Sequence, residues 1–421
     1  MNILLLGGGG REHALAWKLR QSPYCERLYT APGNPGTRAL GDNLDVAVTD
    51  FAGIAGAVGD NAIDLVVVGP EVPLVNGLVD YLHERSPDLA VIGPDRAGAQ
   101  LEGSKAFAKA FMAEYDIPTA PYRRFEAAQV EAGVAYLASQ PGPYVLKADG
   151  LAAGKGVLIV DDLTEAQDRL REMLGGRFGA AGHTVVIEQF LDGTEFSVFV
   201  LTDGTDYQIL PVAKDYKRIG EGDTGLNTGG MGAVSPVPFV TPELLDRVER
   251  TIVQPTVRGI GARGFAYRGI VFIGCILADG HPYVIEYNCR LGDPETEVVL
   301  PRLRNDLVLL FLAAHRGQLA AQRIDVDPRA AATVMLVSGG YPEAYEKGKV
   351  ISGLEEVEDS IPFHAGTRTT DVDGLVTDGG RVLALTSYGL TIGEAVRTSL
   401  KNAARVDFAG KYYRKDIGRD I

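Results

Sequence analysis

Several residue types and patterns are scarce in this chain, and each scarcity excludes a class of protein. The 421 residues include three cysteines, which form no C-x-x-C pair. Neither a disulfide framework nor a cysteine zinc site is therefore expected, and a reducing compartment is favoured. The six histidines form no H-x-x-x-H or H-E-x-x-H cluster, and no G-x-S-x-G sequence occurs. Zinc chemistry and serine-triad hydrolysis lose their usual signals.

Positive charge and long apolar runs are also lacking. The 41 Lys and Arg are outnumbered by 55 Asp and Glu, which leaves a formal net charge of -14. We expect no surface for nucleic acid or for an anionic membrane, because phosphate groups need clustered Lys and Arg. The first apolar run, residues 3–6, stops at Gly7, and no later run approaches the ~18 residues of a membrane span. Cytoplasmic residence is the default expectation, and an anionic substrate must meet local cations or a metal.

The length of the chain suggests about three domains, because 421 residues are too many for one compact core. The N-terminal part alternates strand and helix patterns, which is typical of a parallel doubly wound sheet. We expect strands at residues 2–6, 28–30, 46–48, 65–68 and 91–92, and helices from about residue 11 and across residues 75–85. The predicted fold class is multidomain α/β and α+β, beginning with a doubly wound α/β domain over residues 1–103.

The rest of the chain divides at a linker around residues 318–329. Before it we expect a central domain over residues 104–325, with a small lid subdomain over about 122–190. After it, a small α+β domain is expected over residues 328–421. Its strand and helix patterns lie at residues 333–337, 382–386 and 392–406.

A glycine-rich turn, Gly7 to Gly10, joins the first strand to the helix that starts at Arg11. A dinucleotide fingerprint would put its third glycine at Glu12 or His13, and no acidic residue ends the second strand, so a nicotinamide cofactor is not expected. A small phosphate could still bind at this helix N-terminus, where backbone N–H groups and the helix dipole converge. A tight turn needed only for packing explains the glycines equally well.

A second glycine-rich loop, residues 147–157, carries Lys155 between two β-type runs. Gly150 and Gly154 enclose three residues and a strand follows, whereas a Walker A loop needs four residues and a helix. The pattern instead predicts a strand-loop-strand flap that closes over a triphosphate. An ordinary hairpin with a solvated lysine is the competing interpretation.

Several charged residues around the flap are candidates for nucleotide contact. Lys105 lies in the first turn of a predicted helix that starts at Ser104, where a cation opposes the helix dipole unless it faces a phosphate. Glu188 and Glu195 flank a predicted hinge, residues 190–194, whose backbone could read an adenine edge while a carboxylate binds ribose. As an isolated residue, Lys105 could equally lie in water, and Glu188 and Glu195 would more often be solvated strand ends.

Two further segments combine polar side chains with glycines. Residues 214–218 read Lys-Asp-Tyr-Lys-Arg and precede the loop Asn-Thr-Gly-Gly-Met-Gly at 227–232. Charges that lead into a glycine-rich loop are typical of backbone that contacts a substrate. A mobile surface loop accounts for the same pattern.

The strand predicted near residues 283–290 gives the sharpest chemical pattern. Its two-residue period places Glu286, Asn288 and Arg290 on one face. Mg²⁺ takes one or two carboxylate-type ligands and fills its shell with phosphate oxygens and water, which suits Glu286 and Asn288. Arg290 could steady a carboxylate or a developing oxyanion. The alternative is an exposed polar strand face.

Together these segments resemble the ATP-grasp ligases, and within them the glycinamide ribonucleotide synthetase family. The resemblance extends over essentially the whole chain and depends on the order and spacing of its motifs. The motifs are GGGREHA at 8–14, GPEVPLV at 69–75, QLEGSKAF at 100–107, KADGLAAGKGV at 147–157, NTGGMGA at 227–233 and EYNCRLGDPE at 286–295. Tyr216 departs from a family pattern that often has His before the Lys-Arg pair, so no specific role is expected for it.

The resemblance implies an ATP-dependent ligase that joins glycine to 5-phosphoribosylamine through glycyl phosphate, with residues 104–325 as its ATP-grasp domain. It implies Mg²⁺ or Mn²⁺ held by Glu286 and Asn288, catalytic roles for Arg290 and Lys155, small-molecule partners only, and a monomer. The implied ATP-binding residues are Lys105, Lys147, Lys155, Glu188, Phe190, Leu191 and Glu195. The implied substrate-binding residues are Gly8, Gly9, Gly10, Arg11, Glu71, Asp215, Lys217 and Arg290.

Two other functions fit parts of the same pattern. Another ATP-grasp ligase could use the same flap and metal residues on a different carboxylate or amine, although the N-terminal turn argues for a phosphoribosyl group. A regulatory protein could bind a nucleotide without turnover, although binding alone would not need Glu286, Asn288 and Arg290 together. ATP binding without phosphate release would favour the regulatory protein, and nicotinamide binding would revive a dehydrogenase.

Overall fold

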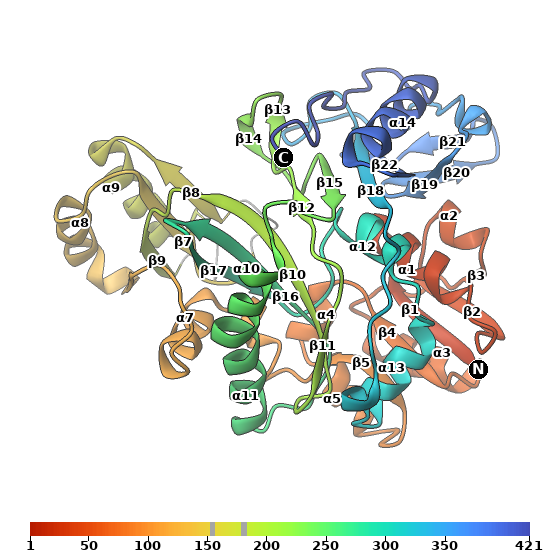
Figure 1. The fold of residues 1–421 in the computed structure, drawn as a ribbon, viewed down its shortest axis with the longest axis horizontal. Coiled ribbons are helices and arrows are strands. Elements are labelled where there is room, and N and C mark those ends of the chain that lie inside the picture. The colour runs from red at the N-terminus through yellow and green to blue at the C-terminus, as the bar shows by residue number, and fades with distance from the viewer. Residues whose placement is uncertain (152–155, 178–182) are drawn as a thin grey trace.

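A computed structural model describes residues 1–151, 156–177 and 183–421. Figure 1 shows an N-terminal unit, a central body crossed by long strands, a small lid subdomain at one side and a C-terminal unit above the first two. Lys155, predicted to contact the nucleotide, lies outside the described residues. The fold class predicted from the sequence is confirmed. The N-terminal unit has a parallel sheet, and the strands of the central body that follow it in the chain pair antiparallel.

The N-terminal unit is a parallel sheet with helices between its strands. Its strands are apolar and buried because both faces are covered, as for β1 and β4. The strands lie in the order β3-β2-β1-β4-β5, and each is parallel to its neighbours. Its elements are β1 (Asn2–Gly7), α1 (Gly10–Leu19), β2 (Arg27–Pro32), α2 (Pro35–Arg38), β3 (Asp42–Asn43), α3 (Phe51–Asp60), β4 (Leu65–Val68), α4 (Glu71–Val75), α5 (Leu78–His83) and β5 (Ala90–Pro94).

Two secondary-structure predictions for this unit are wrong. The third strand is β3 at Asp42–Asn43 and not residues 46–48, because the apolar side chains of Val46 and Val48 pack onto the core from a loop. The helix predicted across residues 75–85 is shorter and begins later, as α5 at Leu78–His83, while Val75 ends the preceding helix α4. The two helices are separated at Gly77, whose φ of 87° is a left-handed conformation that favours glycine and ends a helix.

The central body extends the N-terminal sheet. Strand β5 pairs with β16, which lies between the antiparallel neighbours β10 and β17, so the sheet crosses the predicted boundary at residue 103. Its elements are α6 (Gln100–Gly103), α7 (Lys105–Glu114), β10 (Thr194–Thr202), β11 (Tyr207–Ile209), β12 (Lys214–Asp215), β13 (Arg218–Gly220), β14 (Thr224–Asn227), β15 (Gly232–Ser235), α10 (Pro242–Val248), α11 (Gln254–Ala262), β16 (Tyr267–Ala278), β17 (His281–Asn288), α12 (Thr296–Arg302) and α13 (Leu307–His315).

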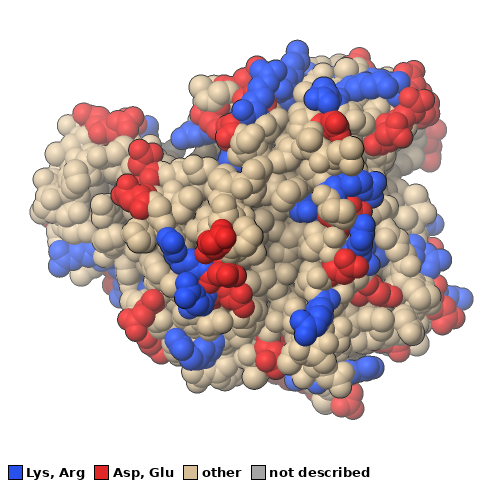
Figure 2. Space-filling model, in the orientation of Figure 1, with Lys and Arg blue, Asp and Glu red and all other residues tan. Residues whose placement is uncertain are grey.

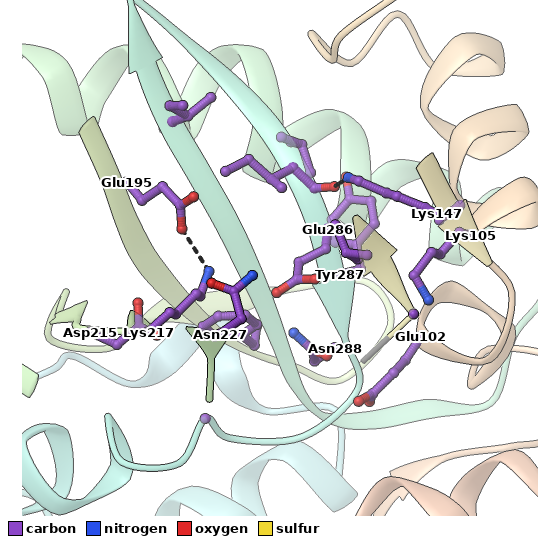
Figure 3. A pocket seen from close by; sticks show the side chains of 18 of the residues that line it. Glu102, Lys105, Lys147, Glu195, Asp215, Lys217, Asn227, Glu286, Tyr287 and Asn288 are labelled. Atoms are coloured by element: carbon purple, nitrogen blue, oxygen red, sulfur yellow. Dashed lines mark hydrogen bonds and ion pairs between the residues drawn. The ribbon is translucent and has the colours of Figure 1, made fainter. Parts of the chain in front are cut away.

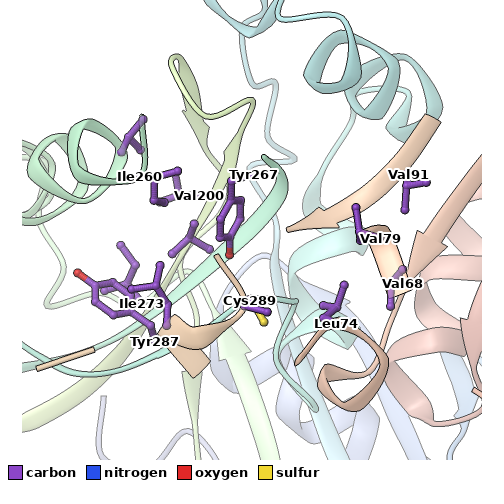
Figure 4. Packing of buried hydrophobic residues seen from close by; sticks show 14 of the residues in the cluster. Val68, Leu74, Val79, Val91, Val200, Ile260, Tyr267, Ile273, Tyr287 and Cys289 are labelled. Carbon is purple, nitrogen blue, oxygen red and sulfur yellow. The ribbon is translucent and has the colours of Figure 1, made fainter. Parts of the chain in front are cut away.

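One hydrophobic cluster continues across this junction. Figure 4 shows Leu74 and Val91 of the N-terminal unit on one side, and Ile273 of β16 with Ile260 of α11 on the other. The buried aromatic ring of Tyr267, 1% exposed, lies where β16 meets β5. The N-terminal and central units therefore share a core.

The lid subdomain has its own four-stranded sheet, in the order β6-β9-β7-β8. The predicted strands on either side of the glycine-rich flap are confirmed, because β7 pairs with β8 and Lys147 lies opposite Val157. A separate apolar cluster fills the space between this sheet and its helices. Its elements are β6 (Tyr122–Glu126), α8 (Val130–Ala138), β7 (Tyr144–Ala148), β8 (Val157–Val160), α9 (Leu163–Glu172), a π-helical turn (Met173–Arg177) and β9 (Thr184–Gln189).

The C-terminal unit is a sheet covered by one amphipathic helix. Its five-stranded sheet, β12-β15-β18-β22-β19, takes two strands from the central body. Its own elements are β18 (Ala330–Val337), β19 (Ser360–His364), β20 (Thr367–Thr370), β21 (Gly374–Thr377), β22 (Arg381–Gly389) and α14 (Ile392–Arg405). The α+β prediction for this region is confirmed.

The surface carries charges of both signs. On the face in Figure 2, Lys and Arg are interspersed with Asp and Glu. Within residues 1–151, 156–177 and 183–421, no helix is long and apolar enough to cross a membrane.

Candidate active site

A cavity of about 530 Å³ lies between the central sheet, the lid and the loops that lead to the C-terminal unit. In Figure 3, Glu286 and Asn288 of β17 lie between Lys105 and Lys147 on one side and Asp215, Lys217 and Glu195 on the other. The structure brings most of the candidate residues into this one space. Those that line it are Arg11, Glu71, Lys105, Lys147, Glu188, Phe190, Leu191, Glu195, Asp215, Lys217, Glu286, Asn288 and Arg290.

Two buried lysines share one carboxylate at the lid side of the cavity. Glu188 of β9 lies 2.9 Å from the Nζ atoms of Lys109 and Lys147, and the three side chains are 2–6% exposed. Lys147 also donates to the carbonyl of Ile285 at 3.1 Å. Burial lowers the pKa of Lys109 to about 8 against the opposing effect of Glu188. The sequence predicted Lys147 and Glu188 but missed Lys109, which occupies an ordinary helix position.

Lys105 is fixed by contacts between α7 and the start of the flap. Ser104 caps α7 by accepting from Phe107 N, and Asp149 accepts from both Ser104 Oγ at 2.9 Å and Ala106 N at 3.1 Å. Lys105 Nζ donates to the Gly150 carbonyl at 3.0 Å. Burial lowers the pKa of Lys105, opposed by Glu286. The predicted cation therefore faces the cavity beside the flap.

Glu286 and Asn288 present oxygen atoms to the cavity from one face of β17, as the strand period predicted. Gly274 lies opposite Glu286 in β16, where an added Cβ would stand 3.1 Å from Glu286 Cγ, so a glycine makes room for the carboxylate. Asn288 Oδ1 accepts from Arg290 Nη2 at 3.3 Å. Among the described residues none donates a hydrogen bond to the Glu286 carboxylate, and no group of three or more His, Cys, Asp or Glu could hold a metal.

Arg290 follows the end of β17 and is held by two carboxylates. Its Nη2 lies 2.7 Å from Glu102 Oε1, and its Nε lies 3.4 Å from Glu71 Oε2. Its side chain is 18% exposed. Burial opposes the charge of Arg290, but Glu102 and Glu71 both favour it, and the pKa of the guanidinium is raised. Glu102 was missed by the sequence reasoning, although it stands inside the QLEGSKAF motif.

A second charged group forms the opposite wall. Lys217 Nζ lies 2.6 Å from Glu195 Oε2, and Ser197 Oγ donates to Glu295 Oε1 at 3.2 Å. Burial raises the pKa of Asp215, and burial together with the charge of Asp215 raises the pKa of Glu295 to about 7. Glu295 and Asp215 both line the cavity.

The N-terminal glycine turn lies next to this space but is partly filled. Gly9 N donates to Glu12 Oε2 at 2.7 Å, and Glu12 Oε1 is paired with Arg11 Nε at 2.8 Å. Gly8, Gly9 and Gly10 do not line the cavity, whereas Arg11 does. The Glu12 carboxylate therefore accepts from the N–H group of Gly9, which was predicted to bind a phosphate.

Arg381 of the C-terminal unit also reaches the cavity. Its Nη1 donates to the carbonyls of Gly229 at 2.6 Å and Asp293 at 2.7 Å, and its Nη2 lies 2.9 Å from Asp293 Oδ1. No sequence motif points to Arg381, because it belongs to an ordinary strand that is remote in the chain from the other motifs.

Family models for the three parts of phosphoribosylglycinamide synthetase match this chain consecutively. The N domain matches residues 1–102, the ATP-grasp (A) domain residues 103–296, and the C domain residues 331–420. The chain belongs to the phosphoribosylglycinamide synthetase family. The resemblance seen in the sequence motifs is therefore confirmed, and ATP and a divalent metal are the general requirements of an ATP-grasp ligase.

Individual relatives of this family are similar along their whole length. A phosphoribosylamine–glycine ligase from Yersinia pestis is 48% identical over 99% of this chain and 98% of its own. One from Escherichia coli O6:H1 is 47% identical over 99% and 98%. The crystal structure of phosphoribosylamine–glycine ligase from Thermotoga maritima has a TM-score of 0.84 at 37% identity and covers 99% of this chain and 100% of its own.

More distant structures share the fold alone. A biotin carboxylase from Campylobacter jejuni has a TM-score of 0.72 at 15% identity, covering 99% of this chain and 93% of its own. The architecture therefore extends beyond the family, and the choice of substrate depends on the residues of the cavity.

Proposed function

We propose that this chain is a phosphoribosylamine–glycine ligase that joins glycine to 5-phosphoribosylamine at the cavity described above, with ATP as the energy source. The full-length relatives that carry this name support the activity. The observation that carries the residue assignments is the convergence on one cavity of Lys105 and Lys147, of Glu286 and Asn288, and of Arg290.

The lid side of the cavity suits the nucleotide. Lys105 and Lys147 supply positive charge for the phosphates, and Phe190, Leu191 and Glu195 lie where the hinge could hold adenine and ribose. Because Glu188 is paired with two lysines, we assign it to holding Lys147 toward the nucleotide. Lys155, which lies outside the described residues, is proposed to cover the phosphates from the flap.

Glu286 and Asn288 fit a divalent cation, because a carboxylate to which no described residue donates a hydrogen bond and an amide oxygen share one face of β17. These are the ligand types that Mg²⁺ or Mn²⁺ takes together with phosphate oxygens. When bound, such a cation would offset negative charge on the triphosphate. The two ligands suit this shared mode, in which the nucleotide completes the coordination.

The reaction then proceeds in two displacements. The carboxylate of glycine attacks the γ-phosphorus of ATP, giving glycyl phosphate and ADP, with Lys105 and Lys147 balancing the charge. The amine of 5-phosphoribosylamine next attacks the carbonyl carbon and phosphate leaves. Arg290, oriented by Glu102 and Glu71, is proposed to stabilise the oxyanion. Closure of the lid would keep water from the acyl phosphate.

The other wall is proposed to hold the two small substrates. Asp215 and Lys217, which line the cavity, are assigned to glycine, and Arg11 and Glu71, which also line it, are assigned to 5-phosphoribosylamine. Gly8, Gly9 and Gly10 are proposed to contact the phosphoribosyl group after Glu12 moves. We also propose that the chain acts as a cytoplasmic monomer on small molecules and not on nucleic acid, which its net charge of -14 supports.

The direct test is phosphate release from ATP and Mg²⁺ with glycine, with and without 5-phosphoribosylamine generated in place. Release that needs both substrates, with glycinamide ribonucleotide identified by mass, is the expected result. ATP binding without such release would leave the fold intact and overturn the substrate assignment.

A further inference from the structure

The last residues of the chain lie against the cavity wall that carries Asp215 and Lys217. Figure 1 shows the C-terminus beside β12 and the β13–β14 hairpin. Asp420 Oδ1 accepts from Tyr216 OH at 2.6 Å, and Asp420 Oδ2 accepts from Lys214 Nζ at 2.7 Å. The backbone N–H of Gly418 donates to Tyr216 OH at 2.9 Å. Gly418 and Asp420, in the C-terminal tail (residues 414–420), thus bind one short segment, residues 214–217.

Successive side chains of this segment contact the tail and the cavity in turn. Lys214 and Tyr216 bind the tail, whereas Asp215 and Lys217 line the cavity. Alternation of this kind follows from extended backbone, in which successive side chains point to opposite sides. Fixing Lys214 and Tyr216 from behind therefore fixes where Asp215 and Lys217 point. Asp420 acts on the cavity through these neighbours and does not line it.

The tail also holds the hairpin that follows. Arg414, whose side chain is 1% exposed, lies 2.6 Å from Asp223 Oδ1 and donates to the Arg218 carbonyl at 3.1 Å. Asp416 accepts from the backbone N–H of Gly222 at 2.7 Å. The hairpin leads directly into residues 227–229, which line the cavity. Both halves of this wall are thus supported by residues 414–420.

We propose that residues 414–420 are a positioning element for the substrate wall of the cavity, with Asp420 and Arg414 as its positioning residues. The role also explains Tyr216, whose position departs from the family pattern and whose hydroxyl joins the tail to β12. The proposal rests on the proposed function, since it assigns residues 214–229 to the small substrates and leaves the nucleotide to the lid side.

The test is steady-state kinetics of Asp420→Asn, with Arg419→Ala as the matched control from the same tail. No hydrogen bond or ion pair of the Arg419 side chain occurs among the described residues. In Asp420→Asn we expect kcat/KM for glycine or for 5-phosphoribosylamine to fall roughly ten- to hundredfold, because small displacements of positioning groups cost this much. The affinity for ATP and the melting temperature should stay close to those of the wild type, as should all properties of Arg419→Ala.

Two results would overturn the proposal. One is an Asp420→Asn enzyme whose kinetics match the wild type. The other is a parallel loss of ATP affinity, melting temperature and turnover, which would mean general destabilisation. If Asp420→Asn does not fold, Tyr216→Phe, which keeps the buried ring and removes only its hydroxyl, must show the same selective loss. Failure of the wild type to form product would instead reject the proposed function.

Discussion

At the scale of single residues, the site depends on charges that are buried in pairs. Glu188 serves Lys109 and Lys147, and Arg290 is shared by Glu102 and Glu71. Such groups gain little net stability from pairing, but removal of one partner leaves the other charge buried and costly. Substitutions inside these clusters are therefore more informative than surface ones.

Glu188→Gln should weaken both the fold and the nucleotide site. Two nearly buried ammonium groups would lose their shared carboxylate, so we expect a loss of about 3 kcal/mol in the free energy of unfolding and weaker ATP binding. Urea unfolding and ATP titration measure the two effects. Glu126→Gln is the control, because its ion pair with Arg124 is more than half exposed and exposed pairs contribute little. Unchanged ATP affinity in Glu188→Gln would contradict the proposed positioning of Lys147.

Arg290→Lys should reduce turnover while the charge is kept. A lysine cannot reproduce the planar fork that lies between Glu102 and Glu71, so the group facing the oxyanion is misplaced. We expect kcat to fall roughly 100- to 1000-fold, the range for loss of one oxyanion donor. Arg329→Lys, which keeps a partly exposed cation near Asp327, should leave kcat unchanged. Equal kcat values for Arg290→Lys and the wild type would remove Arg290 from the chemistry.

At the scale of elements, two buried histidines connect α1 to β19. His364 N donates to His13 Nδ1 at 2.8 Å, and the two rings lie 5.5 Å apart. Burial, with the charge of His364, lowers the pKa of His13 to about 3, and burial lowers that of His364 to about 4. Both rings are neutral in the folded enzyme at neutral pH.

The stability contributed by this neutral pair should be lost as pH falls. Below the ordinary histidine pKa of about 6.5 the unfolded chain takes up protons that the folded chain does not. Stability is therefore complete above pH 6.5 and declines from there toward pH 4. His13→Asn, which offers an acceptor but no titrating group, should show a shallower decline in urea unfolding between pH 7 and 4. The exposed His281→Asn should keep the slope of the wild type, and a slope unchanged in His13→Asn would disprove this origin.

At the scale of the whole molecule, one sheet unites the N-terminal and central units while the lid has its own sheet and core. Such units open separately in native proteins, and opening free energies follow buried contacts. The β16 strand is buried along most of its length, whereas β8 is half exposed.

Hydrogen exchange should separate these two units. Amides of β16 and β5 should exchange together and slowest, and amides of β8 should exchange faster through local opening of the lid. Mass spectrometry of peptides from both regions measures the difference, and an ATP analogue should slow exchange in β8 more than in β16. Equal protection of β8 and β16 in the free enzyme would contradict an independent lid.

Much of the fold follows from local pattern. The apolar runs at β1 and β4, the glycine-rich hairpin and the alternation through Glu286 and Asn288 each predict their elements correctly, because strand period and turn chemistry depend on adjacent residues. The errors occur where a tertiary contact outweighed the pattern. Val46 and Val48 cover a core from a loop, and Gly77 lies before the start of the helix that was predicted from residue 75.

The sequence alone predicted the family, the order of the units and most of the charged residues that line the cavity, since motifs keep their spacing and strand period sets which side chains share a face. Only the tertiary structure decided the supporting contacts. Lys109 and Arg381 carry no local signal, and Asp420 contacts Tyr216 although 204 residues separate the two in the chain. Such contacts depend on which distant surfaces are buried together, and residue spacing does not encode that choice.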